Sequence, residues 1–474
     1  MVVTVRDPAN GRHRAALAIW RQNHGDTFRP YIGRTEAGVG HARPSRLDER
    51  LRALRERPIE PTEKGFGSLA AGGGVSAATL AAAGPALHAA GFTYPLLTLR
   101  ETALRNNIAA MADYCARAGV ALAPHGKTAM SPELAAQQLA HGAWGITVAT
   151  IGQMQAYRAF GFPRLLLANE LVDRAGIAWL AGELAADPGF EAYCYVDSVD
   201  GVRILDQTLE QHRIKGPGRQ LPVLVEIGHA DGRTGCRTDE QALAVAKAAN
   251  AAGTLTVAGV AGYEGSIGGD TEAQTLGRIT AFCRRLRALG GAAAQAGPAR
   301  PIVTAGGSAY FDVVARELTA DGAAAASQVI LRSGAYLTAD HGFYGTVSPA
   351  GRGAADAPAL RPAIELWAQV LSRPEPDLAL VGAGRRDAGF DKGLPVPVGV
   401  LRGDGGREGR TAGWHVTELN DQHAYLRLPP GAALAPGDLV ALGISHPCTT
   451  LDRWRAVVVV NDDGKVTDAV HAFF

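Results

Sequence analysis

Residues 120–150 read VALAPHGKTAMSPELAAQQLAHGAWGITVAT, and this stretch decides the fold. An apolar run at each end encloses a segment, 131–142, that carries the signals of a helix. Ser131 can cap this helix, and Pro132 suits its first turn. Near-continuous apolar strands joined by helices are typical of parallel sheets that are covered on both faces.

The same alternation of apolar runs and helical segments continues along the chain. Besides the runs at 120–126 and 144–150, the predicted strands lie at 164–169, 191–197, 221–228, 255–265, 301–307 and 328–337. A further amphipathic helix is predicted at 271–291. Eight strand–helix units over about 230 residues predict an α/β protein with a TIM-type (β/α)8 barrel. A doubly wound open sheet is the alternative that this pattern leaves open.

The barrel is predicted to occupy residues 92–345, and the sequence pattern differs before and after this range. Residues 1–91 are weakly patterned apart from a short charged helix at 47–57. We expect them to form an N-terminal extension that packs partly on the last domain. After a linker at 351–358, short segments with turn signals predict a mostly-β C-terminal domain over 346–474.

Composition restricts the partners and the compartment. The formal net charge of +1 gives no electrostatic reason to expect a nucleic acid or a membrane surface as partner. The 5 cysteines are scattered along the chain, which favours a reducing compartment over a disulfide framework. No apolar run reaches the roughly 18 residues of a membrane helix, and the first 20 residues lack the pattern of a secretory signal. We therefore expect a cytoplasmic protein.

Lys127 is the first candidate for chemistry, because barrels of this type carry their active sites where strands end and loops toward the helices begin. It follows the first predicted strand in the segment Pro124–Thr128. Burial at the barrel mouth lowers the pKa of a lysine and frees its amine for covalent chemistry with a carbonyl compound. An ordinary lysine on a surface loop is the alternative.

Glycine-rich turns follow the seventh and eighth predicted strands. The candidate residues in these turns are Gly306, Gly307, Ser308, Ser333 and Gly334. Loops at these two places often bind phosphate in barrels, since backbone N–H groups at glycines can receive an anion. A lysine on one side of the barrel mouth and phosphate-binding turns on the opposite side suit pyridoxal 5′-phosphate (PLP).

Two other strand ends offer side chains to the ring of such a cofactor. Arg233 follows the fifth predicted strand and could face the pyridine nitrogen, while Tyr263 follows the sixth and could stack or donate a hydrogen bond. A salt-bridged loop arginine and a packed barrel tyrosine are the alternatives.

The stretch SHPCTT at 445–450 places an imidazole, His446, two residues from a thiol, Cys448. The pair could bind Zn²⁺, and a zinc with so few protein ligands keeps positions open for a substrate. Two unrelated strand-end residues are the alternative. Further ligands or supporting side chains could come from Asp340, His341 and His423.

In their order along the chain, the motifs APHGKT, GITVAT, ANELV, GRTG, GYEG, TAGGS, RSGAY and GISHPCTTLDRW resemble those of the fold-type III PLP enzymes. The resemblance is to the branch with eukaryotic-type D-serine dehydratase, D-threo-3-hydroxyaspartate dehydratase and D-threonine aldolase, and it runs from about residue 92 to the C-terminus. HPCTT is its most specific element, since the dehydratases of this branch carry His-x-Cys as zinc ligands and the aldolases carry His-x-Asp.

This resemblance implies an alanine-racemase-like barrel in a homodimer. It implies that Lys127 binds PLP and acts on the substrate, and that His446 and Cys448 bind Zn²⁺. It places the remaining cofactor contacts at His125, Arg233, Tyr263, Gly306, Gly307, Ser308, Ser333, Gly334 and Tyr336.

The implied activity is that of a lyase of the D-serine ammonia-lyase type. A 3-hydroxy-D-amino acid, with D-serine first among them, would be converted to a 2-oxo acid and ammonia, with zinc assisting the departure of the β-hydroxyl group. The alternatives are a metal-dependent aldolase of the D-threonine type, an amino-acid racemase and a PLP-carrier protein without catalytic activity.

Overall fold

The computed structural model describes residues 45–474 except for 89–90, 213, 215–219, 294–299, 403–406 and 410. The first 20 residues, for which the sequence predicts no secretory signal, lie outside the described residues, as does about half of the predicted N-terminal extension. None of the helices in the described ranges combines the length and the apolar character that crossing a membrane requires.

Eight parallel strands form one curled sheet in the order β2-β9-β8-β7-β6-β5-β4-β3. Their bounds are β2 (Ala121–Leu122), β3 (Ile146–Val148), β4 (Arg164–Glu170), β5 (Glu191–Val196), β6 (Leu221–Ile227), β7 (Leu255–Gly262), β8 (Ile302–Ala305) and β9 (Gln328–Leu331). The end strands β2 and β3 meet through a parallel bridge between His125 and Thr147. The amide of Trp144 also donates to the carbonyl of Leu122. The predicted barrel is confirmed, with each of its eight strands where the sequence placed it.

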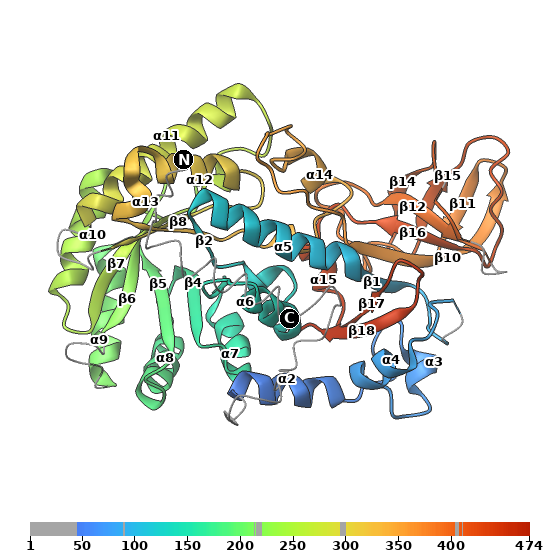
Figure 1. Ribbon diagram of the computed structural model, residues 1–474, viewed down its shortest axis with the longest axis horizontal. Helices are drawn as coiled ribbons and strands as arrows, with labels where there is room; N and C mark the ends of the chain where they lie inside the picture. Colours follow the sequence, from blue (N-terminus) through green and yellow to red (C-terminus); the bar gives the residue numbers. More distant parts are fainter. Residues whose placement is uncertain are drawn as a thin grey trace, which may run out of the picture.

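Helices cover the outside of this ring of strands (Figure 1). They are α5 (Glu101–Ala118), α6 (Pro132–Ala140), α7 (Ile151–Phe160), α8 (Arg174–Ala186), α9 (Val199–Gln211), α10 (Asp239–Ala251), α11 (Ala273–Ala293), α12 (Phe311–Thr319) and α13 (Ala323–Ala326). Helix α6 begins as the sequence predicts, because the Ser131 hydroxyl accepts a hydrogen bond from the Leu134 amide.

The side chains of each strand alternate between two cores. Val223 and Val225 of β6 pack outward against the helices, in the largest hydrophobic cluster. Leu224 packs inward in a separate cluster with Leu166 and Tyr195 of neighbouring strands. This alternation continues to the strand ends, so it also determines which polar side chains face the barrel mouth.

A second sheet of ten strands has the main order β13-β12-β16-β10-β1-β17-β18, and β11, β14 and β15 extend it from β10. The bounds are β1 (Leu96–Arg100), β10 (Ile364–Glu375), β11 (Leu378–Val381), β12 (Val396–Leu401), β13 (Arg407–Glu408), β14 (His415–Leu419), β15 (Ala424–Arg427), β16 (Leu439–Gly443), β17 (Ala456–Val460) and β18 (Val466–His471). Two short helices, α14 (Phe343–Val347) and α15 (Cys448–Leu451), lie between these strands and the barrel.

Strand β1 falls within 92–345, the range that the sequence assigned to the barrel, yet it pairs with β10 and β17 of the second sheet. Both of its faces are buried there, since Leu96 packs in one hydrophobic cluster and Leu97 and Leu99 pack in another. The barrel therefore begins at β2, after α5.

The described part of the N-terminal extension contains α2 (Arg46–Glu56), α3 (Gly67–Ala70) and α4 (Ala77–Ala83). Phe66 and Leu80 pack in one cluster with Val458 of β17. Arg55 forms a buried ion pair with Asp468 of β18, in which its Nη1 lies 2.7 and 2.5 Å from the two carboxylate oxygens. These contacts attach the extension to the second sheet.

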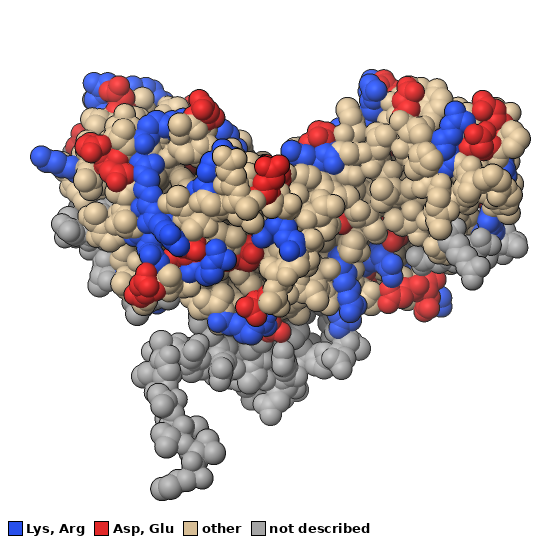
Figure 2. Space-filling model, turned by 90° about the horizontal axis from the view of Figure 1, so that it is seen from above, with Lys and Arg blue, Asp and Glu red and all other residues tan. Residues whose placement is uncertain are grey.

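The end of the chain is attached to the barrel. His471 Nδ1 lies 2.8 Å from Oε1 of Glu133 in α6, and the Phe473 amide donates to the carbonyl of Met130. These contacts hold the C-terminal strands against the end of the barrel that carries Lys127. Seen from above, the barrel and the far end of the second sheet form two lobes separated by a broad notch, with charges of both signs interspersed on that face (Figure 2).

Candidate active site

Lys127 lies in a tight turn, η1 (Gly126–Thr128), directly after β2, and its side chain is exposed to solvent at the barrel mouth. Glycines allow this turn to pack closely on its neighbours. A Cβ at Gly126 would lie 2.6 Å from the Tyr157 hydroxyl, and a Cβ at Gly334 would lie 2.5 Å from the carbonyl oxygen of His125. Any larger residue at either position would displace the turn that carries the lysine.

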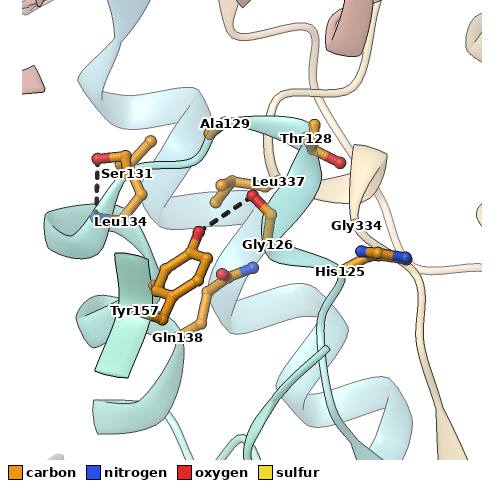
Figure 3. A pocket seen from close by; sticks show the side chains of 11 residues that line it. His125, Gly126, Thr128, Ala129, Ser131, Leu134, Gln138, Tyr157, Gly334 and Leu337 are labelled. Carbon is orange, nitrogen blue, oxygen red and sulfur yellow. Dashed lines mark hydrogen bonds between the residues drawn. The ribbon is translucent and has the colours of Figure 1, made fainter. Parts of the chain in front are cut away.

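A small cavity of about 10 Å³ lies behind this turn and is lined by Gly126, Gln138 and Tyr157, among others (Figure 3). The Tyr157 hydroxyl donates a hydrogen bond of 3.0 Å to the Gly126 carbonyl beside it. The cavity has room for about one water molecule. A cofactor bound to Lys127 would therefore have to lie on the other side of the turn, in the open mouth.

The surroundings of Lys127 favour its neutral amine. Although the side chain keeps contact with solvent, partial burial of its amine in the mouth lowers the pKa of Lys127, the Cys448 side chain opposes this shift, and the positive charges of Arg233 and Arg332 reinforce it. The neutral amine is the form that attacks a carbonyl carbon.

Arg233 and Tyr263 form a stacked pair at the mouth. The guanidinium carbon of Arg233 lies 4.6 Å from the centre of the Tyr263 ring. The ring in turn packs on the turn after β8, where a Cβ at Gly307 would lie 2.9 Å from Tyr263 Cε2. Burial raises the pKa of Tyr263, so its hydroxyl stays protonated and can donate a hydrogen bond. The two side chains therefore pack on each other and on the glycine turn after β8.

The two glycine turns are tied to each other and to a buried carboxylate that the sequence analysis missed. The amides of Gly306 and Gly307 donate to Glu264, at 3.0 and 2.6 Å. The Ser333 hydroxyl donates to the Gly306 carbonyl, and Ser308 Oγ accepts from the Ala335 amide. The carboxylate shows that these amides can receive negative charge. A phosphate could accept hydrogen bonds from these two amides only if it replaced Glu264. Ser308, Ser333 and Gly334 are the predicted phosphate contacts that remain beside Glu264.

Arg332 is a second residue that the sequence analysis missed, although it belongs to the quoted motif RSGAY. It is buried and donates to Thr304 Oγ1 at 2.7 Å and to the Gly262 carbonyl at 2.6 Å. His125 lies beneath the same mouth, where burial and then the charges of Lys127, Arg332 and Arg233 hold its pKa well below the usual range. His125 is therefore neutral.

Tyr336 does not join this group. Its side chain is buried in the core outside the ring of strands, and its hydroxyl accepts a hydrogen bond of 2.7 Å from Gln138 of α6. Tyr336 lies in the turn η5 (Ala335–Leu337). Proximity to Gly334 in the sequence therefore does not bring Tyr336 to the mouth.

His446 and Cys448 lie beside the turn that carries Lys127. Cys448 Sγ is 3.6 Å from the hydroxyl oxygen of Thr128. His446 Nδ1 is 2.7 Å from Asp391 Oδ2, and the Thr449 hydroxyl donates to the other oxygen of Asp391 at 2.8 Å. A hydrogen bond with Cys448 is the largest influence that raises the pKa of His446. An imidazole with one nitrogen fixed by a carboxylate is the usual arrangement of a metal ligand.

Among the described residues, no third His, Cys, Asp or Glu joins His446 and Cys448 in a cluster with ligand atoms within 4.8 Å of one another. The carboxylate of Asp340 instead accepts hydrogen bonds from the amides of Gly342 and Tyr344, and burial raises its pKa to about 7. An imidazole with a thiolate suits zinc, and a site with so few protein ligands leaves positions for other molecules. The residues present therefore fit the predicted zinc.

Replacing Gly126 with alanine tests how strictly the turn is packed. We expect the free energy of unfolding to fall by about 1–3 kcal/mol, because the added methyl group collides with the Tyr157 ring. The matched control is Gly182→Ala within α8, where a Cβ would meet no atom within 4 Å. The control should be neutral or more stable by up to about 1 kcal/mol. Equal stability of the two variants in urea unfolding would contradict this account of the turn.

Comparison with known proteins gives a consistent picture. Residues 99–316 match the family model described as the N-terminal domain of alanine racemase, and residues 363–460 match the model described as a putative serine dehydratase domain. The chain is 31% identical to D-threonine aldolase of Arthrobacter sp over 383 residues, which cover 79% of this chain and 90% of that protein.

Solved structures extend this likeness. The D-threonine aldolase from Filomicrobium marinum is 25% identical, with a TM-score of 0.68 over 81% of this chain and 95% of that one. The D-threo-3-hydroxyaspartate dehydratase from Delftia sp. HT23 is 21% identical, with a TM-score of 0.62 over 80% and 97% of the two chains, and this likeness shows the fold alone. The chain belongs to the fold-type III family of lyases that contains D-serine dehydratase, D-threo-3-hydroxyaspartate dehydratase and D-threonine aldolase.

Proposed function

We propose that the protein is a PLP- and zinc-dependent dehydratase that converts a 3-hydroxy-D-amino acid, most of all D-serine, to a 2-oxo acid and ammonia. The observation that carries this proposal is the contact between Cys448 Sγ and the Thr128 hydroxyl at 3.6 Å. The side chain of Cys448, one of the two proposed zinc ligands, therefore lies beside the turn of Lys127. A base and a Lewis acid can therefore act on adjacent carbon atoms of one substrate.

The residues of the mouth are suited to hold PLP. Lys127 would bind it covalently, Arg233 and Tyr263 would face its ring, and Ser308, Ser333 and Gly334 would receive its phosphate. Bound there, PLP would supply an electron sink that makes the α-hydrogen of an attached amino acid acidic. The neutral His125 beneath the mouth adds no further positive charge.

Lys127 would also act as the base of the reaction. With a substrate in place, the free Nζ atom of Lys127 would accept the α-hydrogen as a proton. Burial and the two arginines keep a larger fraction of this amine unprotonated than in an ordinary lysine. The lysine is thus both the anchor of the cofactor and the base.

The β-hydroxyl group is a poor leaving group, and zinc held by His446 and Cys448 would supply the Lewis acid that assists its departure. Asp391 fixes the imidazole by holding Nδ1, which leaves the other ring nitrogen for the metal. Loss of water from D-serine leaves an enamine, which tautomerises and reacts with water to give pyruvate and ammonia.

Aldol cleavage is the second candidate, and the 31% identity to a D-threonine aldolase favours it. This reaction would break the bond between Cα and Cβ and give glycine and an aldehyde, and it needs a base at the β-hydroxyl group. The cysteine at position 448 supports the dehydratase, because the resemblance associates His-x-Cys with dehydratases and His-x-Asp with aldolases.

Product analysis separates the two reactions. The purified protein, supplied with PLP and zinc, is incubated with D-serine, D-threonine, D-threo-3-hydroxyaspartate and, as a control, L-serine. We expect ammonia and pyruvate from D-serine and neither from L-serine. Glycine and an aldehyde without ammonia would replace the dehydratase with the aldolase. Absence of both kinds of product from all three D-amino acids would refute both candidates.

We further propose that the protein is a cytoplasmic homodimer, as the family resemblance implies. All five cysteines are unpaired, which supports a reducing compartment. Light scattering should give a mass about twice the 49.3 kDa of one chain.

A further inference from the structure

Three carboxylates meet at another part of the barrel mouth. Glu170 ends β4, Asp197 follows β5 and Glu226 lies near the end of β6. One ligand oxygen from each lies within 4.8 Å of the other two. The three strands are neighbours in the barrel, so this meeting results from the order of the strands. Neither the proposed function nor the sequence motifs assign a role to the group.

The strand register turns all three side chains inward. Glu170 pairs with Tyr195, and Val196 pairs with Val225, so the next residues along the two strands, Asp197 and Glu226, are also neighbours. Tyr195 packs in the hydrophobic cluster inside the ring. Since side chains alternate along a strand, Asp197 points to the same side as Tyr195.

A second, independent observation comes from Tyr195. Its side chain is only 2% exposed, and its buried hydroxyl has no hydrogen-bond partner among the described residues. Tyr195 is the register partner of Glu170, so both side chains lie on the inner face of the sheet. Burial raises the pKa of the Tyr195 hydroxyl, and the charges of Glu226 and Glu170 raise it further. Buried polar atoms are normally paired, because leaving them unpaired costs about 1–3 kcal/mol.

The neighbouring positive charges do not compensate the carboxylates through hydrogen bonds. The buried guanidinium group of Arg332 lies 5.8 Å from the centre of the Tyr195 ring, but it donates to Thr304 and Gly262. Oδ2 of Asp197 accepts only a backbone hydrogen bond of 3.0 Å, from Gly235, among the contacts of the described chain. Burial, then the charge of Glu226, and then a side-chain hydrogen bond between the two carboxyl groups raise the pKa of Glu170 to about 9. The group therefore needs a proton or a cation to be stable.

We propose that Glu170, Asp197 and Glu226, with the Tyr195 hydroxyl, bind one hard divalent cation of the Mg²⁺, Mn²⁺ or Ca²⁺ class. Such ions are bound by oxygen atoms at about 2.0–2.6 Å, so two ligands on opposite sides of the ion lie about 4–5 Å apart. The spacing within the carboxylate group agrees with this range.

The ligand types separate this site from the zinc pair. His446 and Cys448 offer nitrogen and sulfur, which suit zinc, whereas the carboxylate group offers only oxygen. Neither His446 nor Cys448 has a ligand atom that joins the carboxylate group. Each site should therefore select its own metal from a mixture.

Binding of Mn²⁺ alone tests the proposal. Titration of the zinc-loaded protein, followed by electron paramagnetic resonance, should show one bound Mn²⁺ per chain. Glu226→Gln and Glu170→Gln should each weaken binding at least about ten-fold, while His446→Ala should leave it unchanged. Excitation of tyrosine should sensitise the emission of bound Tb³⁺, and Tyr195→Phe should reduce that emission.

The proposal is refuted if the wild-type protein binds no Mn²⁺, if both glutamine variants bind it as before, or if binding is lost in His446→Ala. Glu170 is less buried than Glu226, so Glu170→Gln decides the outcome if Glu226→Gln does not fold. The measurement is independent of the lyase reaction. Bound Mn²⁺ in a protein without lyase activity would refute the proposed function and leave the second site in place.

Discussion

Lys127→Ala is expected to abolish the visible absorption of lysine-bound PLP and to lower the rate of product formation by about 10²–10⁴-fold or more. Two functions are lost at once, because the same amine holds the cofactor and accepts the α-hydrogen. The unfolding transition should stay in place, since the Lys127 side chain is exposed and contributes no core contact. Absorption spectra after dialysis against PLP, together with the ammonia assay, measure both effects.

Lys247→Ala is the matched control for this variant. Lys247 is exposed on the outer face of α10, where it has no part in the barrel mouth. This variant should keep both the absorption band and the activity. If the band persisted in Lys127→Ala and disappeared in Lys247→Ala, the cofactor would be bound elsewhere and the assignment of the mouth would fail.

The barrel could be predicted because each of its strands is a short apolar run between helical segments, and local pattern is enough to find such runs. Local pattern does not show which sheet a strand joins, and β1 is an example, because the range predicted for the barrel included it. Its run, Leu96–Leu99, has the same apolar character as the barrel strands, but it pairs with β10 and β17. The partner of a strand depends on contacts with residues hundreds of positions away, which local pattern does not contain.

The candidate site also contains residues that local sequence pattern could predict and residues that it could not. Lys127 and the glycines could be found because their neighbours in the sequence form recognisable turns. Asp391 could not, since it contacts His446 across 55 positions and has no motif of its own. Glu264 was hidden for a different reason: it lies inside the motif GYEG, yet its partners are the amides of the turn after β8. Only the folded barrel shows that this carboxylate competes with a phosphate.

His446→Ala should remove bound zinc and reduce the elimination reaction at least about 10²-fold, while the absorption band of the cofactor persists. The expected separation follows from the structure, because His446 and Cys448 come from the C-terminal segment, whereas the predicted cofactor contacts come from the barrel loops. Metal analysis, absorption spectra and the ammonia assay on the same sample give the three readouts. Treatment of the wild-type protein with a chelator should reproduce the result, and added zinc should restore activity only in the wild type.

Two further variants make this test specific to the metal. His415→Ala changes an exposed histidine of β14 and should leave bound zinc and activity as they are. Asp391→Asn keeps both ligands but weakens the hold on Nδ1 of His446, so zinc should bind about 10–100-fold more weakly and activity should return at high zinc concentration. Because a merely structural role of His446 would not respond to added zinc, this rescue distinguishes a metal ligand from a packing residue. Full ammonia release from a sample shown to contain no zinc would remove the metal from the reaction and leave Lys127 as the sole source of catalysis.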